Sequence, residues 1–246
     1  MPLREEFESS GNWLFRRRSW LPLLLYPFAV AILYFYHDRT YPYISDISWS
    51  FICLAVSFLG LLVRAITVGH TPKGTSGRNT EQQIAECLNH TGIYSVVRHP
   101  LYLGNFLMWL GLFMYPGVWW FVATCSLVYW LYYERIMFAE EEFLRRLYPR
   151  IYEEWAGKTP AFVPRLTGWQ ASSLPFSLRN VLKREYNGLF ATVLSFTILN
   201  ALGHYFATQR WQVDDWWQII FVLGAATFII LRSLKKYTNV LEIAGR

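Results

Sequence analysis

Long apolar stretches with almost no charged side chains dominate this chain. A membrane-spanning helix needs about 20 mainly apolar residues, and six stretches approach that length. We expect spans over residues 21–36, 47–68, 101–114, 118–133, 188–206 and 213–231. A short Pro-Gly turn separates the third from the fourth, which predicts a tight helical hairpin. The predicted fold is all-α, a polytopic membrane protein with about six transmembrane helices and a cytoplasmic helical cap.

Composition supports this prediction. Of the 246 residues, 54% are hydrophobic and 16% are charged, whereas an ordinary soluble domain is about a quarter charged. These values exclude a disordered chain, a coiled coil and a collagen-like fibre, and they disfavour a soluble globular domain. We expect residues 1–68 to hold the first two spans, 69–166 a core with the hairpin and two polar segments, and 167–246 a linker and the last two spans.

Lys and Arg are distributed unevenly along the chain. Twenty lie near the termini or in the two long polar segments, and only Arg39 and Arg210 fall on the opposite side. Because cytoplasmic loops carry an excess of Lys and Arg, a multi-pass integral membrane protein with both termini in the cytoplasm is predicted. No small-residue cleavage site follows the first apolar stretch, so we interpret it as a span rather than a signal peptide. The expected partner is the lipid bilayer and not nucleic acid; the oligomeric state stays open.

The first polar segment, residues 69–100, is rich in Gly and Thr at its start. His70, Lys73 and Arg78, with backbone amides of the Gly-rich turns, could bind an anionic head group; the alternative is a plain loop. Arg98 and His99 directly precede Pro100, a residue suited to the first turn of a helix. Free N–H groups at that helix start favour a carboxylate, although the pair could also be a simple interfacial anchor.

The second polar segment, residues 134–187, opens with carboxylates. Glu140 and Glu141 follow the fourth span, at the interface where Arg98 and His99 are also expected. They could form a solvated helix face. Alternatively, a carboxylate binds an ammonium and the basic pair binds a carboxylate, so together they would be complementary to an amino-acid zwitterion. The three cysteines are scattered, so neither a disulfide framework nor a metal site is expected.

Several of these residues form a pattern that resembles a known family. The pattern is Gly92-x-Tyr94-x-x-x-Arg98-His99-Pro100-x-Tyr102-x-Gly104, an apolar hairpin, Glu140-Glu141-x-x-Leu144 and Pro160-x-Phe162-x-Pro164. It resembles the isoprenylcysteine carboxyl methyltransferases over roughly residues 68–166. The related phospholipid N-methyltransferases share the Arg-His-Pro and Glu-Glu pieces. The resemblance implies an integral membrane enzyme that transfers a methyl group from S-adenosylmethionine.

The resemblance also implies roles for individual residues. Glu140 and Glu141 would hold the amino end of the cofactor, and Arg98 would serve the charge balance of the pocket. Arg135 is the candidate to orient the acceptor, although its spacing departs slightly from the family pattern. The implied catalytic residues are Arg98, Arg135 and Glu140, and the implied cofactor-binding residues are Tyr94, His99, Pro100, Tyr102, Leu103, Gly104, Glu140 and Glu141. The last two spans lie beyond the usual family core.

The methyl acceptor is less defined than the reaction. A prenylcysteine carboxylate is the family default, and a lipid head group such as a phosphate or phosphoethanolamine is the alternative. An ionised oxygen needs no general base, whereas an amine would have to lose a proton to Glu140 or Glu141. A transporter is a reading of another class, because Arg64 and a few other polar residues lie inside spans, but no inverted repeat is evident. A non-enzymatic scaffold would not explain why the Arg-His-Pro and Glu-Glu pieces occur together.

Overall fold

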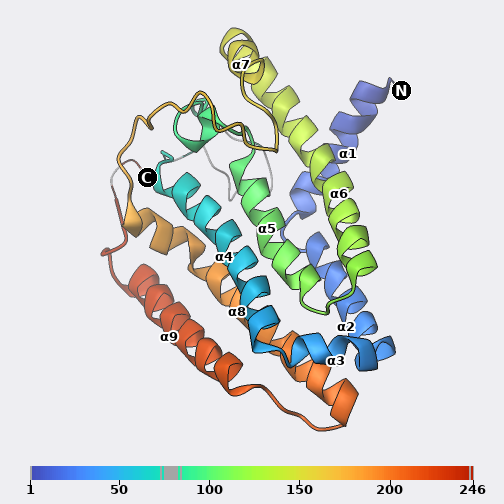
Figure 1. Ribbon diagram of the computed structural model, residues 1–246. Helices are drawn as coiled ribbons and strands as arrows, with labels where there is room; N and C mark the ends of the chain where they lie inside the picture. Colours follow the sequence, from blue (N-terminus) through green and yellow to red (C-terminus); the bar gives the residue numbers. More distant parts are fainter. Residues whose placement is uncertain (1, 73, 75–82, 84, 244, 246) are drawn as a thin grey trace.

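The computed structural model describes residues 2–72, 74, 83, 85–243 and 245, and Figure 1 shows their arrangement. This part of the chain contains nine α-helices and no β-strand, which confirms the all-α prediction. The helices are α1 (Leu3–Arg17), α2 (Leu25–Phe35), α3 (His37–Ile44), α4 (Ile47–Gly69), α5 (Pro100–Met114), α6 (Trp119–Leu147), α7 (Pro149–Ala156), α8 (Leu178–Thr208) and α9 (Asp215–Tyr237). Helices α5 and α6 form the predicted hairpin, while α4 packs against both α5 and α8 (Figure 1).

By length and composition, fewer helices qualify as membrane spans than the six that the sequence predicts. Among the described residues, α4, α8 and α9 are long and apolar enough to cross a membrane. A fourth candidate combines α1 with the segment Leu21–Phe35, but the two are bent by 82°. Helix α5 has 15 residues, about 22 Å at 1.5 Å per residue, which is short for a hydrocarbon core of about 30 Å. Six spans therefore stay a prediction, and three or four candidates are found.

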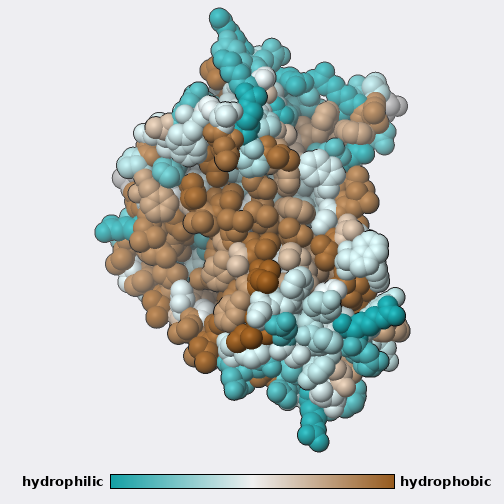
Figure 2. All heavy atoms as spheres, in the orientation of Figure 1, coloured by the Kyte–Doolittle hydropathy of each residue, from teal (hydrophilic) through white to brown (hydrophobic). Residues whose placement is uncertain are grey.

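The surface of the molecule carries an apolar belt. In the face shown in Figure 2, hydrophobic side chains cover the middle of the bundle, and hydrophilic side chains gather at both ends. Exposed side chains of α4 and α9 include Phe51, Leu59, Ile219, Val222 and Ile229. Large apolar side chains at the surface of long helices are what a lipid environment requires. The fold is therefore that of a helical membrane protein.

Local sequence signals explain where the long helices begin. The carboxylate of Asp46 accepts hydrogen bonds from the backbone N–H groups of Ser48 and Trp49 at 2.7 and 3.2 Å, which caps α4. Ser177 caps α8 by accepting from the N–H of Asn180 at 3.3 Å. Such caps satisfy N–H groups that have no partner within the helix. The apolar pattern predicts only residues 188–206 of α8, because the first turns of this helix are polar.

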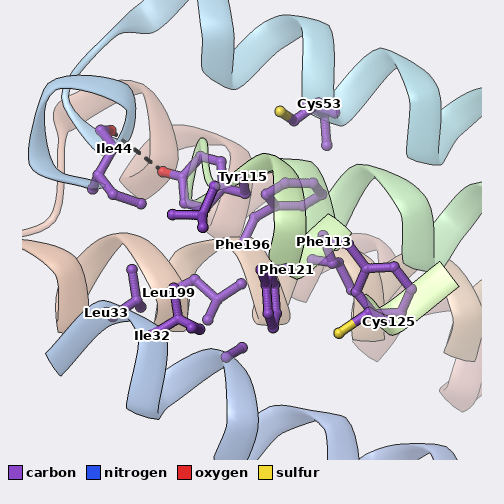
Figure 3. Close-up of a cluster of buried hydrophobic side chains, with 14 of the residues drawn as sticks. Ile32, Leu33, Ile44, Cys53, Phe113, Tyr115, Phe121, Cys125, Phe196 and Leu199 are labelled. Atoms are coloured by element: carbon purple, nitrogen blue, oxygen red, sulfur yellow. Dashed lines mark hydrogen bonds between the residues drawn. The ribbon is translucent and has the colours of Figure 1, made fainter. Parts of the chain in front are cut away.

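A buried core lies at the end of the bundle where the turn joins α5 to α6. Figure 3 shows side chains from α2, α3, α4, α5, α6 and α8 that pack together, with Tyr115 next to Ile44. The hydroxyl of Tyr115 donates to the carbonyl of Ile44 at 3.5 Å and accepts from Trp217 Nε1 at 3.0 Å and Asn200 Nδ2 at 3.1 Å. Asn200 also donates to Asp214 Oδ2 at 2.7 Å. These bonds fasten the α8–α9 pair to the hairpin.

Candidate active site

The Arg98–His99 pair is held by a segment that follows α7. The backbone N–H groups of Arg98 and His99 donate to the carbonyls of Pro160 and Ala161 at 2.9 and 3.1 Å. Further along, the N–H of Arg165 donates to the carbonyl of Val96 at 2.9 Å. This segment is not helical and bends at residues 161–163. The two basic residues are thereby fixed directly before Pro100, the first residue of α5.

Glu141 lies at the centre of a cluster of hydrogen-bond donors. Its Oε1 is 2.9 Å from His99 Nε2 and 3.0 Å from Arg98 Nε, and its Oε2 accepts from the Tyr152 hydroxyl at 2.7 Å. Arg98 also donates from Nη1 to the carbonyl of Ala156 at 2.9 Å. Burial alone would raise the pKa of Glu141, but the hydrogen bond and charge of His99, the charge of Arg98 and the Tyr152 bond together lower it. The carboxylate is therefore ionised at neutral pH, and both of its oxygens have partners within the protein.

Glu140, the neighbouring carboxylate, faces a cavity instead. The hydroxyl of Tyr102 donates to its Oε1 at 2.6 Å, and its Oε2 lies 3.7 Å from His99 Nδ1. A quarter of its side chain, 25%, is exposed, against 6% for His99. The cavity has a volume of about 560 Å³, a size typical of small-molecule sites. Glu140 thus offers a negative charge to whatever fills this space.

The cavity is built from most of the bundle. Its lining comes from α1, α4, α5, α6, α7 and α8 and from the loop before α5. Tyr94, in that loop, is half-buried, and burial raises its pKa with a further contribution from the charge of Glu140. The indole Nε1 of Trp155 donates to the carbonyl of Tyr94 at 2.8 Å and so joins α7 to the same loop. Aromatic, cationic and anionic groups therefore surround one space.

The structure brings most of the predicted site residues together. The predicted residues that line the cavity are Tyr94, Arg98, His99, Pro100, Tyr102 and Glu140. Glu141 stands behind them, in contact with His99 and Arg98. The two predicted basic residues Lys73 and Arg78 lie outside the described residues.

Four predicted residues lie elsewhere. Gly104 faces α4, where an added Cβ would come within 2.8 Å of the Gly60 carbonyl. The guanidinium of Arg135 stacks on Phe7 of α1 at 3.2 Å from the ring centroid. His70 donates from Nδ1 to the carbonyl of Ile66 at 2.9 Å and packs on Phe176. These three and Leu103 do not border the cavity.

Other residues of the lining were not predicted as part of the site. Phe15 and Arg18 come from α1 and the turn after it, and Arg184 and Glu185 come from the first turns of α8. Arg64 and Asn105, which also line the cavity, gave a signal in the sequence, as polar residues inside predicted spans. The others belong to segments far from the motif in the chain, which only the fold brings close.

The comparisons with known proteins identify relatives of this chain. The family model described as phospholipid methyltransferase matches residues 49–151. A cobalt-zinc-cadmium resistance protein of Cupriavidus metallidurans is 31% identical over 199 residues, which cover 78% of this chain and 87% of the relative. A nickel-cobalt-cadmium resistance protein of Alcaligenes xylosoxydans xylosoxydans is 31% identical over 129 residues, 52% of this chain and 58% of that protein.

A third relative is an enzyme by name. The protein-S-isoprenylcysteine O-methyltransferase of Schizosaccharomyces pombe is 39% identical over 75 residues, 30% of this chain and 31% of the enzyme. No solved structure matches the chain. The residues that the family model matches contain the loop before α5, the hairpin, Glu140 at the cavity and Glu141 behind it. The chain therefore belongs to the phospholipid methyltransferase and isoprenylcysteine carboxyl methyltransferase family of membrane methyltransferases.

Proposed function

We propose that this chain uses S-adenosylmethionine to methylate a lipid-linked acceptor at the cytoplasmic face of the membrane. The observation that carries the proposal is the meeting of His99 and Glu140 at one cavity, with Arg98 beside them. A carboxylate and two basic side chains in one pocket match the ammonium and carboxylate of an amino-acid moiety. Family membership supplies the type of reaction.

The donor set of the cavity fits the cofactor. Glu140 would hold the ammonium group. The hydrogen bond from the Tyr102 hydroxyl would keep the Glu140 carboxylate turned toward the cavity. Arg98 and His99 would hold the carboxylate group, and Glu141 fixes both of these side chains from behind. S-adenosylmethionine would supply an electrophilic methyl group on a sulfonium. The contribution of the chain is then alignment of two reactants in a site that excludes water, which is a large source of rate enhancement.

The acceptor that we favour is a carboxylate on a prenylated cysteine. Such an oxygen is ionised at neutral pH and brings no proton that a base must remove. The competing acceptor is a lipid head group, either a phosphate or the amine of phosphoethanolamine. An amine acceptor would give a proton to a base, for which Glu140 is the placed candidate.

Cofactor binding tests the proposal directly. We expect the purified protein in nanodiscs to bind S-adenosylmethionine with micromolar-scale affinity in calorimetry. Glu140→Gln should weaken binding about tenfold or more, because a charge-assisted hydrogen bond contributes roughly 1.5–3 kcal/mol. Glu153→Gln, an exposed carboxylate of α7, is the matched control and should bind as the wild type does. Folded wild-type protein that shows no binding heat would refute the proposal.

Transfer of a labelled methyl group identifies the acceptor. The protein is incubated with methyl-labelled cofactor, total membrane lipid and prenylcysteine analogues, and the fractions are separated. Label in the prenylcysteine fraction supports the favoured acceptor. Label in a phospholipid fraction supports the head-group alternative instead, and label in neither contradicts methylation of a lipid-linked acceptor.

A further inference from the structure

A second set of charged side chains lines the cavity on the side of α4 and α8. Arg64 donates from Nε and Nη2 to the two carboxylate oxygens of Glu185 at 2.7 and 2.8 Å. It also donates from Nη1 to Asn105 Oδ1 at 2.6 Å. The side chain of Glu185 is 7% exposed and that of Arg64 is 21% exposed. A buried ion pair seldom stabilises a fold more than packed apolar side chains would, and charges within apolar helices usually mark functional sites.

Arg184 precedes Glu185 in α8 and lines the same cavity. Its charge acts on the Tyr94 hydroxyl: burial and the charge of Glu140 raise the pKa of that group, and the charges of Arg184 and Arg64 oppose the rise. The cations of α4 and α8 and the anion of α6 therefore act on the same hydroxyl. Within the described lining there are four arginines, Arg18, Arg64, Arg98 and Arg184, against the two glutamates Glu140 and Glu185. Because Glu185 already pairs with Arg64, an anion in this space would meet the donors that this pair leaves over.

We propose that Arg184 and Arg64 bind the anionic group of the methyl acceptor, a carboxylate or a phosphate carried on a lipid chain. Glu185 and Asn105 are positioning residues that fix the plane of the Arg64 guanidinium. A guanidinium has five N–H donors, and the bonds to Glu185 and Asn105 use three of them. The remaining donors of Arg64, together with the guanidinium of Arg184 at the same cavity, suit the two oxygens of a carboxylate or phosphate.

This assignment rests on the proposed function and extends the active site to helix α8. Arg184 and Glu185 lie in α8, outside the residues 49–151 that the family model matches. Cofactor and acceptor groups would then have separate partners, with Glu140 for the ammonium and Arg184 for the acceptor anion. Selection of the acceptor would depend on the C-terminal helix pair, which the motif does not reach.

The test replaces Arg184 and measures binding of the two substrates separately. For Arg184→Gln we expect the KM for a prenylcysteine analogue or phosphatidic acid to rise about tenfold or more, because a charge-assisted hydrogen bond is lost. The Kd for S-adenosylmethionine should stay at the wild-type value, which also shows that the variant is folded. Arg184→Lys should recover part of the loss. Arg179→Gln changes an exposed arginine of the same helix and is the matched control.

The results separate this inference from the proposed function. Equal KM values for Arg184→Gln and Arg179→Gln would overturn the inference while cofactor binding stands. Wild-type protein that binds no cofactor and labels no probe would remove the proposed function itself, and this inference with it.

Discussion

Two adjacent carboxylates of α6 have different environments and therefore different tasks. Successive residues of an α-helix point about 100° apart, so Glu140 opens to the cavity while Glu141 enters the cluster of His99, Arg98 and Tyr152. We assign the contact with the cofactor to Glu140 and a positioning role to Glu141. A positioning residue acts through the groups that it orients. The ionisation of Glu141 can be followed through the pH dependence of stability.

The lowered pKa of Glu141 makes a prediction about stability and pH. Because folding lowers this pKa, the ionised carboxylate stabilises the fold above its unfolded-state pKa, and the contribution is lost as the pH falls through the folded value. We expect Glu141→Gln to unfold more readily than the wild type at neutral pH, with a difference that shrinks as the pH is lowered. Unfolding midpoints in detergent across this pH range measure it. Glu153→Gln is the control, and a difference for Glu141→Gln that is constant with pH would contradict the account.

Part of the site could be predicted from sequence because it is contiguous. Residues 94–104 and the Glu pair form a motif whose spacing survives without any tertiary structure, and Tyr94, His99, Tyr102 and Glu140 indeed border the cavity. Arg135 could not be placed in this way, because α1 packs over it through Phe7. Neither could Arg184, because a polar helical turn far along the chain carries no sign of what it faces.

At the scale of elements, α4 and α5 both line the cavity and lie in close contact with each other. An added Cβ on Gly104 would lie 2.5 Å from Arg64 Cγ and 2.8 Å from the Gly60 carbonyl oxygen, both closer than van der Waals contact allows. Two helical turns further along α5, Gly111 lies equally close to Ser57 of α4. Small residues at these positions let the two backbones meet, as in other packed membrane helices. The position of Arg64 next to Asn105 depends on this contact.

We therefore expect Gly104→Ala to separate α4 from α5 and to lower the free energy of unfolding by about 1–3 kcal/mol, the usual cost of overpacking. Gly188→Ala is the matched control within α8, because its Cβ would meet Met108 Cε at an ordinary 3.5 Å. Unfolding midpoints of the detergent-solubilised variants compare the two. A Gly104→Ala protein as stable as Gly188→Ala would show that the helices are not in close contact.

The long helices were predicted more reliably than their ends. Residues 47–68, predicted from their apolar run, match α4 (Ile47–Gly69), which Asp46 caps. Residues 188–206 are only the apolar part of α8 (Leu178–Thr208), whose polar first turns continue the helix into the site. Helix α1 was not predicted, because its sequence is too polar to be recognised as a span. In the fold it packs on α6 through Phe7, Phe15 and the Arg4–Glu142 ion pair.

At the scale of the whole molecule, the site lies at the end of the bundle that carries most of the positive charge. Figure 1 places both chain ends toward the end where α7 lies. The excess of Lys and Arg in the segments around α7 predicts that this end faces the cytoplasm. The opposite end has the loop between α8 and α9, which contains Arg210. Substrates and cofactor would then meet at the cytoplasmic interface.

The native cysteines offer a test of this orientation. Cys53 and Cys125 are buried, while Cys87 is exposed in the first polar segment. A membrane-impermeant maleimide should therefore label the protein in permeabilised cells and not in intact cells, and Cys87→Ser should abolish the labelling. In the Cys87→Ser background, Arg210→Cys should react in intact cells, because that exposed position belongs to the opposite end. Labelling of Cys87 in intact cells would reverse the orientation and place the site outside the cytoplasm, where a prenylated cytoplasmic substrate could not reach it.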